Sequence, residues 1–175
     1  MTVSRLTMIL QLRQECIFAA MKLLMVCLGN ICRSPLAEGI MKHKVMAAGL
    51  AWEIDSAGTG GYHVGEPPHV LSQKVSMCNG IDISTQQCRQ FRKEDMDRFD
   101  RILVMDTSNY REVKRISGSR WNPHKVSLLL DILYPGGNRE VPDPWYGTEK
   151  DYHTVFKMID EACEKLVTEL AKPDR

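Results

Sequence analysis

Long apolar segments are absent from this sequence. No apolar run approaches the roughly 20 residues that a membrane-spanning helix needs, so we expect no membrane partner. An excess of charge is also absent, because 23 Lys and Arg residues balance 22 Asp and Glu residues, for a net charge of +1. A nucleic-acid partner would call for a basic surface, so this balance gives no support to one.

Metal-binding cysteine patterns are missing as well. The six cysteines form no Cys-x-x-Cys pair and the five histidines do not cluster with them, so we expect no metal site. The first 20 residues lack the long apolar core of a secretory signal, which favours a cytoplasmic protein whose cysteines stay reduced. The cysteines stand at positions 16, 27, 32, 78, 88 and 163.

Motifs for nucleotide cofactors are lacking too. There is no Gly-x4-Gly-Lys-Ser/Thr run, and the glycines at 58–61 are followed by Pro67 and Pro68 where a dinucleotide-binding helix would already be running. We therefore expect no cofactor.

The length of 175 residues suits one domain, which we place at 21–172. Residues 1–20 are then an N-terminal extension. Met21 could be the natural start, with the extension arising from an upstream start codon, or the extension could be a short helix packed loosely on the domain.

What the sequence does contain is an alternation of strand and helix patterns. Buried strands are expected at 22–26, 52–57, 101–106 and 126–130, and helices at 35–48, 68–79, 108–117 and 149–171. This order predicts an α/β fold with three layers, in which a four-stranded parallel sheet has helices on both faces. Ligands bind such sheets at the carboxyl ends of the strands. The segment 89–101 interleaves basic and acidic residues, and this pattern favours a solvent-exposed face.

The run Cys27-Leu-Gly-Asn-Ile-Cys-Arg33, followed by Ser34-Pro35, lies between the first strand and the first helix. The unpaired N–H groups and the dipole of a helix N-terminus favour a bound anion there. The Arg33 guanidinium matches two phosphate oxygens. Thiolates are stabilised in such surroundings. We therefore expect Cys27 to attack a bound phosphoryl group and form a phosphocysteine that water hydrolyses.

A proton donor for the leaving oxygen is offered by the sequence Val-Pro-Asp143-Pro-Trp145-Tyr146-Gly. The two prolines stiffen this loop. The aromatic neighbours partly desolvate the carboxyl, which favours its protonated form. Asp143 could then activate the hydrolytic water in turn. Asp106, at the end of another predicted strand, is the reserve candidate for the acid or a hydrogen-bond partner in the site.

Three motifs in this order resemble the low-molecular-weight protein tyrosine phosphatases of bacterial type. They are residues 27–34, the run Asp-Ser-Ala-Gly-Thr-Gly-Gly-Tyr-His-Val-Gly at 55–65, and Asp-Pro-Trp-Tyr-Gly at 143–147. The resemblance covers about residues 21–170 and implies a flavodoxin-like fold of the phosphotyrosine phosphatase I type. It implies metal-independent hydrolysis of phosphotyrosine in proteins and of small aryl phosphates.

The resemblance also implies a role for each matching residue. Cys27, Arg33 and Asp143 would be catalytic, Ser34 would stabilise the thiolate, and Asn30 would brace the loop through Ser56. The implied phosphate-binding residues are Leu28, Gly29, Asn30, Ile31, Cys32, Arg33 and Ser34, and the implied substrate-cleft residues are Tyr62, Trp145 and Tyr146. Trp145 stands where the family often has a tyrosine, so regulation by phosphorylation at that position is in doubt.

Cys32 has two interpretations. As the resemblance suggests, it could form a disulfide with Cys27 that protects the nucleophile from irreversible oxidation. Alternatively, it packs the loop against the sheet.

Two other functions stay open. An arsenate reductase on the same fold would need further cysteines, for which Cys78 and Cys88 are the nearby pair, although Asp143 argues for ester hydrolysis. A catalytically silent phosphate-binding module would have no use for Asp143. The expected partner is a tyrosine-phosphorylated protein, of which a bacterial tyrosine kinase is one candidate, and the expected assembly is a monomer or weak dimer.

Overall fold

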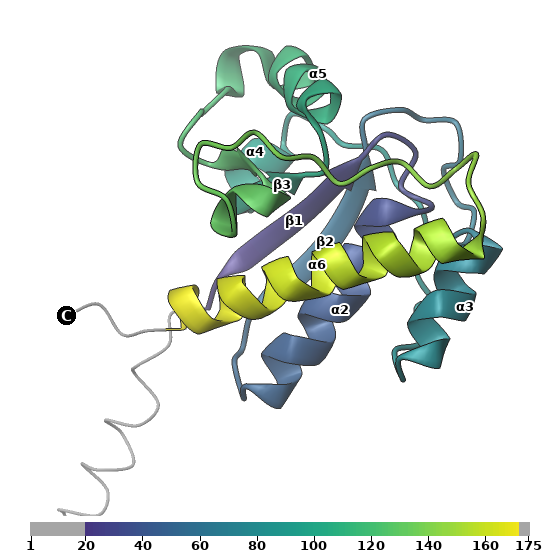
Figure 1. The fold of residues 1–175 in the computed structure, drawn as a ribbon. Coiled ribbons are helices and arrows are strands. Elements are labelled where there is room, and N and C mark those ends of the chain that lie inside the picture. Colours follow the sequence, from purple (N-terminus) through teal and green to yellow (C-terminus); the bar gives the residue numbers. More distant parts are fainter. Residues whose placement is uncertain (1–19, 172–175) are drawn as a thin grey trace, which may run out of the picture.

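The computed structural model describes residues 20–171 (Figure 1). Its centre is a sheet of four parallel strands in the order β2-β1-β3-β4. The strands are β1 (Lys22–Cys27), β2 (Glu53–Gly58), β3 (Arg101–Val104) and β4 (Val126–Leu128). The helices are α2 (Arg33–Ala47), α3 (Val70–Cys78), α4 (Asp95–Arg98), α5 (Thr107–Ser117) and α6 (Glu149–Leu170), with short 3-10 turns at Gly118–Arg120 and Leu129–Ile132.

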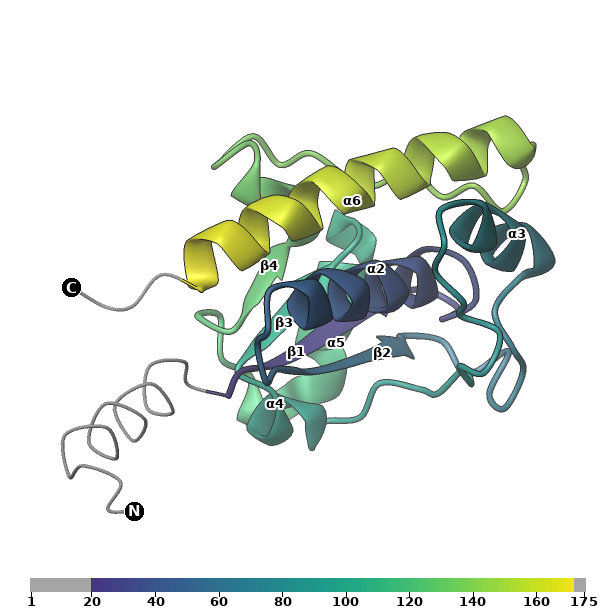
Figure 2. The same cartoon turned by 90° about the horizontal axis from the view of Figure 1, so that it is seen from below.

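Helices cover both faces of the sheet, as the sequence predicts. One hydrophobic core joins the sheet to α2, α3 and α6, and a second joins it to α4 and α5. Figures 1 and 2 show α2 and α6 together on one side of β1 and α5 on the other. The strand order reverses at β1, since β2 lies on one side of it and β3 on the other, and this reversal opens a crevice at the carboxyl end of β1.

Helix α2 begins earlier than predicted. It starts at Arg33, so Pro35 is its third residue and not its first. The first four N–H groups of a helix have no partner within the helix, so a proline is tolerated at the third position as well. The earlier start places Arg33 and Ser34 in the first turn of α2, directly after the loop that connects β1 to α2.

The strands β3 and β4 end earlier than predicted. After Val104 the chain turns, and the Asp106 carboxylate caps α5 by accepting the Asn109 N–H at 2.7 Å. After Leu128 the chain winds into a 3-10 turn. Apolar residues continue past both strand ends, so hydrophobicity alone cannot mark where hydrogen bonding to the neighbouring strand stops.

The exposed face predicted for 89–101 is wrong for Asp95. Asp95 is buried and lies 3.0 Å from the Arg89 guanidinium, which also pairs with Asp55 at 2.9 Å. Alternating charges near a sheet edge can satisfy one another in a buried network, and their pattern in the sequence does not distinguish this from a solvated surface.

Of the predicted domain 21–172, the last residue lies outside the described part, and the domain bounds stay a prediction. The N-terminal extension lies outside the described residues apart from Ala20, and so does Cys16.

Candidate active site

The loop from Leu28 to Cys32 connects β1 to α2 at the carboxyl edge of the sheet. Asn30 has a φ of 55°, the left-handed conformation that asparagine adopts more readily than most residues. The segment after β2 supports the loop, because Thr59 N–H donates to the Cys27 carbonyl oxygen at 2.9 Å and Gly60 N–H to that of Leu28 at 2.8 Å. We call residues 27–33 the phosphate loop from here on.

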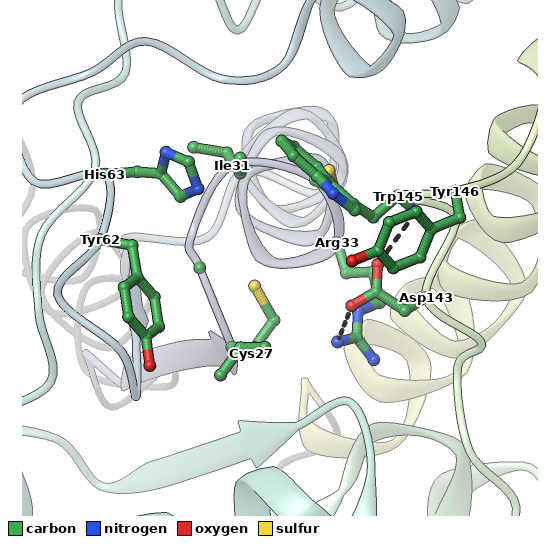
Figure 3. A pocket seen from close by; sticks show the side chains of 11 residues that line it. Cys27, Ile31, Arg33, Tyr62, His63, Asp143, Trp145 and Tyr146 are labelled. Carbon is green, nitrogen blue, oxygen red and sulfur yellow. Dashed lines mark hydrogen bonds and ion pairs between the residues drawn. The ribbon is translucent and has the colours of Figure 1, made fainter.

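The Cys27 sulfur lies inside the curl of the phosphate loop (Figure 3). The Asn30 N–H donates to it at 3.2 Å, and the Ser34 hydroxyl oxygen lies 3.0 Å away. Both groups can donate to a sulfur anion, which can only accept. The Cys27 sulfur therefore has two hydrogen-bond donors within reach inside the loop.

The Asn30 side chain fixes the direction of these hydrogen bonds. Its Oδ1 accepts the Arg89 N–H at 2.9 Å, so its Nδ2 must be the donor to Ser34 Oγ at 2.9 Å and to Ser56 Oγ at 2.8 Å. The bond to Ser56 confirms the one that the family resemblance implies. The Ser34 hydroxyl, whose oxygen accepts from Asn30, has two groups to donate to: the Cys27 sulfur at 3.0 Å and, at a longer distance of 3.4 Å, the Ala57 carbonyl oxygen.

Glu38 extends this network, and the sequence analysis missed it. Its buried carboxylate accepts the Ser56 hydroxyl at 2.5 Å, and its other oxygen pairs with the exposed Lys42 at 2.5 Å. A carboxylate can only accept, so Ser56 must donate to it and leave its own oxygen for Asn30. In the sequence, Glu38 stands among the apolar residues of α2, and this position could have indicated a buried carboxylate.

Arg33 is almost fully buried, with 3% of its side chain exposed, and it is held from two sides. One terminal nitrogen donates to Asp106 Oδ2 at 2.7 Å and to the Val141 carbonyl oxygen at 3.1 Å. The other donates to Asp143 Oδ2 at 2.7 Å. The guanidinium is thereby oriented before any ligand arrives.

Asp106 holds the Arg33 guanidinium from the inner side of the site. Burial alone would raise its pKa, but bonds from the Ser108 hydroxyl, the Asn109 N–H and Arg33 together hold the pKa below its ordinary value. Asp106 therefore stays ionised and balances the charge of Arg33. Of the two roles that the sequence left open, the geometry favours the hydrogen-bond partner.

Asp143 lies in the loop between β4 and α6, opposite Cys27 in the cleft (Figure 3). Its side chain is 42% exposed, more than expected for a carboxyl shielded by aromatic neighbours. One oxygen pairs with Arg33, and the other accepts the Trp145 N–H at 3.1 Å. This carboxyl is thus a counter-ion of Arg33.

A cavity of about 300 Å³ opens above the phosphate loop. Cys27 and Arg33 line it together with the three predicted cleft residues, Tyr62, Trp145 and Tyr146. The two tyrosines project mostly into solvent, so they form a rim, while Trp145 is less exposed, at 42%. His63 also lines the cavity. The sequence analysis missed it, although it directly follows Tyr62.

The chain is similar to known proteins over most of its length. The family model described as "Low molecular weight phosphotyrosine protein phosphatase" matches residues 22–175. The chain belongs to this family. Members of this family are phosphoric monoester hydrolases, so the chain falls in that enzyme class.

Individual relatives span nearly the whole domain. The chain is 44% identical over 154 residues to a Synechocystis protein described as a candidate low-molecular-weight protein-tyrosine-phosphatase, covering 87% of this chain and 98% of that one. It is 38% identical over 147 residues to the human low molecular weight phosphotyrosine protein phosphatase, covering 83% and 92%. The crystal structure of YfkJ from Bacillus subtilis superposes with a TM-score of 0.79 at 35% identity, covering 87% of this chain and 95% of that chain.

The cysteines of this phosphatase-family chain occupy different surroundings. Cys27 and Cys32 line the cleft as free thiols, and Cys32 Sγ lies 3.4 Å from the Tyr152 hydroxyl. Burial raises the pKa of Cys32 to about 11. Cys88 is buried and donates to the Asn30 carbonyl oxygen at 2.6 Å, whereas Cys78 is exposed at the end of α3. The Cys27–Cys32 disulfide stays a prediction.

Within residues 20–171, no group of three or more His, Cys, Asp or Glu side chains could hold a metal ion. In the same range, no helix is long and apolar enough to cross a membrane.

Proposed function

We propose that the chain hydrolyses phosphotyrosine in proteins through a phosphocysteine intermediate. The observation that carries this proposal is the convergence of the Cys27 sulfur, the Arg33 guanidinium and the Asp143 carboxyl on one cleft. Family membership supports the reaction class, and the cleft geometry supports the roles of these three residues.

Substrate binding would rearrange the charges around Arg33. A phosphoryl dianion held by the phosphate-loop amides competes with Asp143 for the outward nitrogen of Arg33, whereas Asp106 keeps the inner one. Asp143 loses its counter-ion and faces a new negative charge. Asp143 is then free to act as the general acid, for which it must carry a proton.

The chemistry then proceeds in two steps. The Cys27 thiolate attacks phosphorus and forms the S–P bond as the P–O bond to the tyrosine oxygen breaks, and Asp143 gives its proton to that oxygen. Asp143, now a carboxylate, takes a proton from water as the water attacks phosphocysteine. The S–P bond breaks, inorganic phosphate forms, and the thiolate returns to its hydrogen bonds with Ser34 and Asn30.

The shape of the site favours an aryl ester. Tyr62, Trp145 and Tyr146 surround the entrance, and flat rings pack well against aromatic side chains. A phosphotyrosine carries such a ring next to its phosphate, whereas phosphoserine has none. We extend the proposal to a tyrosine-phosphorylated kinase as one candidate substrate and to a monomer or weak dimer as the working assembly.

The test compares aryl phosphates with good and poor leaving groups. Cys27→Ser should abolish turnover of p-nitrophenyl phosphate and still bind inorganic phosphate. Asp143→Ala should lower kcat/KM for phenyl phosphate by about 10²-fold or more, because general acid catalysis contributes roughly 10²–10⁴, and should affect p-nitrophenyl phosphate much less. A good leaving group departs without a proton.

An equal loss for both leaving groups in Asp143→Ala would refute the acid assignment. Full activity of Cys27→Ser would refute the phosphocysteine intermediate. Phosphoserine peptides, and arsenate with a thiol reductant, serve as the control substrates, and faster turnover of either would contradict the proposed substrate class.

A further inference from the structure

The loop that carries Asp143 has few attachments of its own. Residues 141–147 lie outside any helix or strand, and Pro142 and Pro144 have no N–H to donate. The Val141 N–H fixes the start of the loop by donating to the Met105 carbonyl oxygen at 2.8 Å. Asp143 itself is tied to Arg33, the group that the substrate must engage. When phosphate takes over Arg33, another contact has to keep Asp143 in place.

Trp145 offers such a contact through two histidine rings. The ring centroids of Trp145 and His63 are 5.8 Å apart at an angle of 46°, and those of Trp145 and His69 are 5.4 Å apart in an edge-to-face arrangement at 61°. Figure 3 shows His63 and Trp145 on the same side of the cleft, with Ile31 between them in that view. These separations lie within the range of favourable aromatic pairs.

Both histidines belong to the segment that supports the phosphate loop. The His69 N–H donates to the Ile31 carbonyl oxygen at 2.7 Å, and the Gly60 N–H donates to that of Leu28 at 2.8 Å. A contact with these rings therefore places Trp145 relative to the phosphate loop. It does so without using Arg33.

Each histidine ring is itself held in place. His63 Nδ1 lies 2.8 Å from a carboxylate oxygen of Glu66. His69 Nδ1 accepts the Leu71 N–H at 3.3 Å, which caps α3, and the His69 ring stacks on buried Tyr152 with centroids 5.4 Å apart at 17°. The rings are thus preorganised supports, as a positioning role requires.

We propose that His63 and His69 are positioning residues for the general acid. They hold Trp145, and Trp145 in turn holds Asp143, because its N–H donates to Asp143 Oδ1 at 3.1 Å. The two rings thereby keep Asp143 over the phosphate loop after its ion pair with Arg33 is broken. This inference rests on the proposed function for the role of Asp143.

Two substitutions separate the ring of His69 from its capping function. His69→Asn keeps a capping residue and removes the ring, while His69→Phe keeps a ring and removes the acceptor. In His69→Asn we expect kcat/KM for phenyl phosphate to fall roughly 3- to 10-fold, and that for p-nitrophenyl phosphate by less than about twofold. His69→Phe should keep the wild-type ratio of the two values and lower Tm.

His63→Gln retains a polar partner for Glu66. It should lower kcat/KM for phenyl phosphate as His69→Asn does, and the double variant should lower that value further than either single variant. His43→Asn, at an exposed position of α2, is the matched control and should change neither value. The proposal would be overturned if the ratio of kcat/KM for phenyl phosphate to kcat/KM for p-nitrophenyl phosphate were the same as in wild type in both His69→Asn and His63→Gln.

A second measurement does not depend on turnover. Acrylamide quenching of Trp145, obtained by difference from Trp145→Phe and measured with inorganic phosphate bound, should increase in His69→Asn and not in His69→Phe. Equal quenching in wild type and His69→Asn would contradict the contact. If the wild-type protein turned over no aryl phosphate, the proposed function would fail, and the positioning role of the histidines would fail with it. If wild type turned over aryl phosphates normally but the histidine variants kept the wild-type ratio of the two kcat/KM values, only the histidine proposal would fail.

Discussion

Asn30 satisfies several requirements of the phosphate loop with one side chain and one backbone conformation. Its N–H and its Nδ2 reach Cys27, Ser34 and Ser56, and its Oδ1 accepts from the backbone of Arg89. Its φ of 55° would be strained for most residues. The cost of replacing it therefore has two parts, lost hydrogen bonds and backbone strain.

A pair of substitutions measures these parts separately. Asn30→Ala should lower the free energy of unfolding by about 2–4 kcal/mol, because it leaves buried partners unsatisfied and strains the backbone. Asn30→Gly loses the same hydrogen bonds without the strain, and its loss should be smaller by about 1 kcal/mol. Both should slow turnover of aryl phosphates, since Ser34 is no longer oriented toward Cys27. Urea denaturation and steady-state kinetics provide the measurements. If Asn30→Gly were the less stable of the two, strain would not be the deciding cost.

At the scale of elements, the loop after β2 and helix α3 meet the site through His69. The neutral imidazole accepts the Leu71 N–H at the start of α3. Burial lowers the pKa of His69 below its ordinary value. A protonated imidazole carries a proton on both nitrogens and can no longer act as this cap.

This cap predicts a pH dependence with a definite sign. Because the pKa of His69 is lower in the folded chain than in the unfolded one, the unfolded chain binds its proton first as the pH falls. The stability that neutral His69 contributes is present above pH of about 6.5 and is lost as the pH drops through the folded pKa. The difference in unfolding free energy between wild type and His69→Asn should therefore narrow from pH 7.5 to pH 5.5, as followed by urea denaturation. A constant difference would contradict this account.

At the scale of the whole molecule, stability depends on two cores that share one sheet. Ile40 on α2 belongs to the core under α6, and Ile102 on β3 belongs to the core on the other face. Both side chains are fully buried. Since the strands between these cores are common to both, we expect the domain to unfold as one unit.

Truncation of either core residue tests this expectation. Ile40→Ala and Ile102→Ala should each lower the free energy of unfolding by about 2–5 kcal/mol, because each leaves a cavity. Circular dichroism and tryptophan fluorescence should give one coincident urea transition for each variant. Met46→Ala, at an exposed position of α2, should change stability by less than about 0.5 kcal/mol. Separate transitions for the two probes would indicate that the cores unfold independently.

The sequence by itself determined the fold class, the order of the elements and the phosphate loop. These are local properties: apolar runs set strands and helix faces, and Cys27, Asn30 and Arg33 are separated by a few residues whose backbone preferences act directly on the loop. Asp143 could be proposed because the loop chemistry called for an acid, and its flanking prolines marked a stiff loop.

Only the tertiary structure decided which distant residues complete the site. Glu38, Asp106 and the two histidines His63 and His69 come from three separate segments of the chain, and nothing in their local sequence says what they contact. Their roles depend on how strand order, helix packing and loop closure bring these segments to one edge of the sheet. Burial and hydrogen-bond direction then fix the charge and orientation of each group, and both are properties of the folded chain alone.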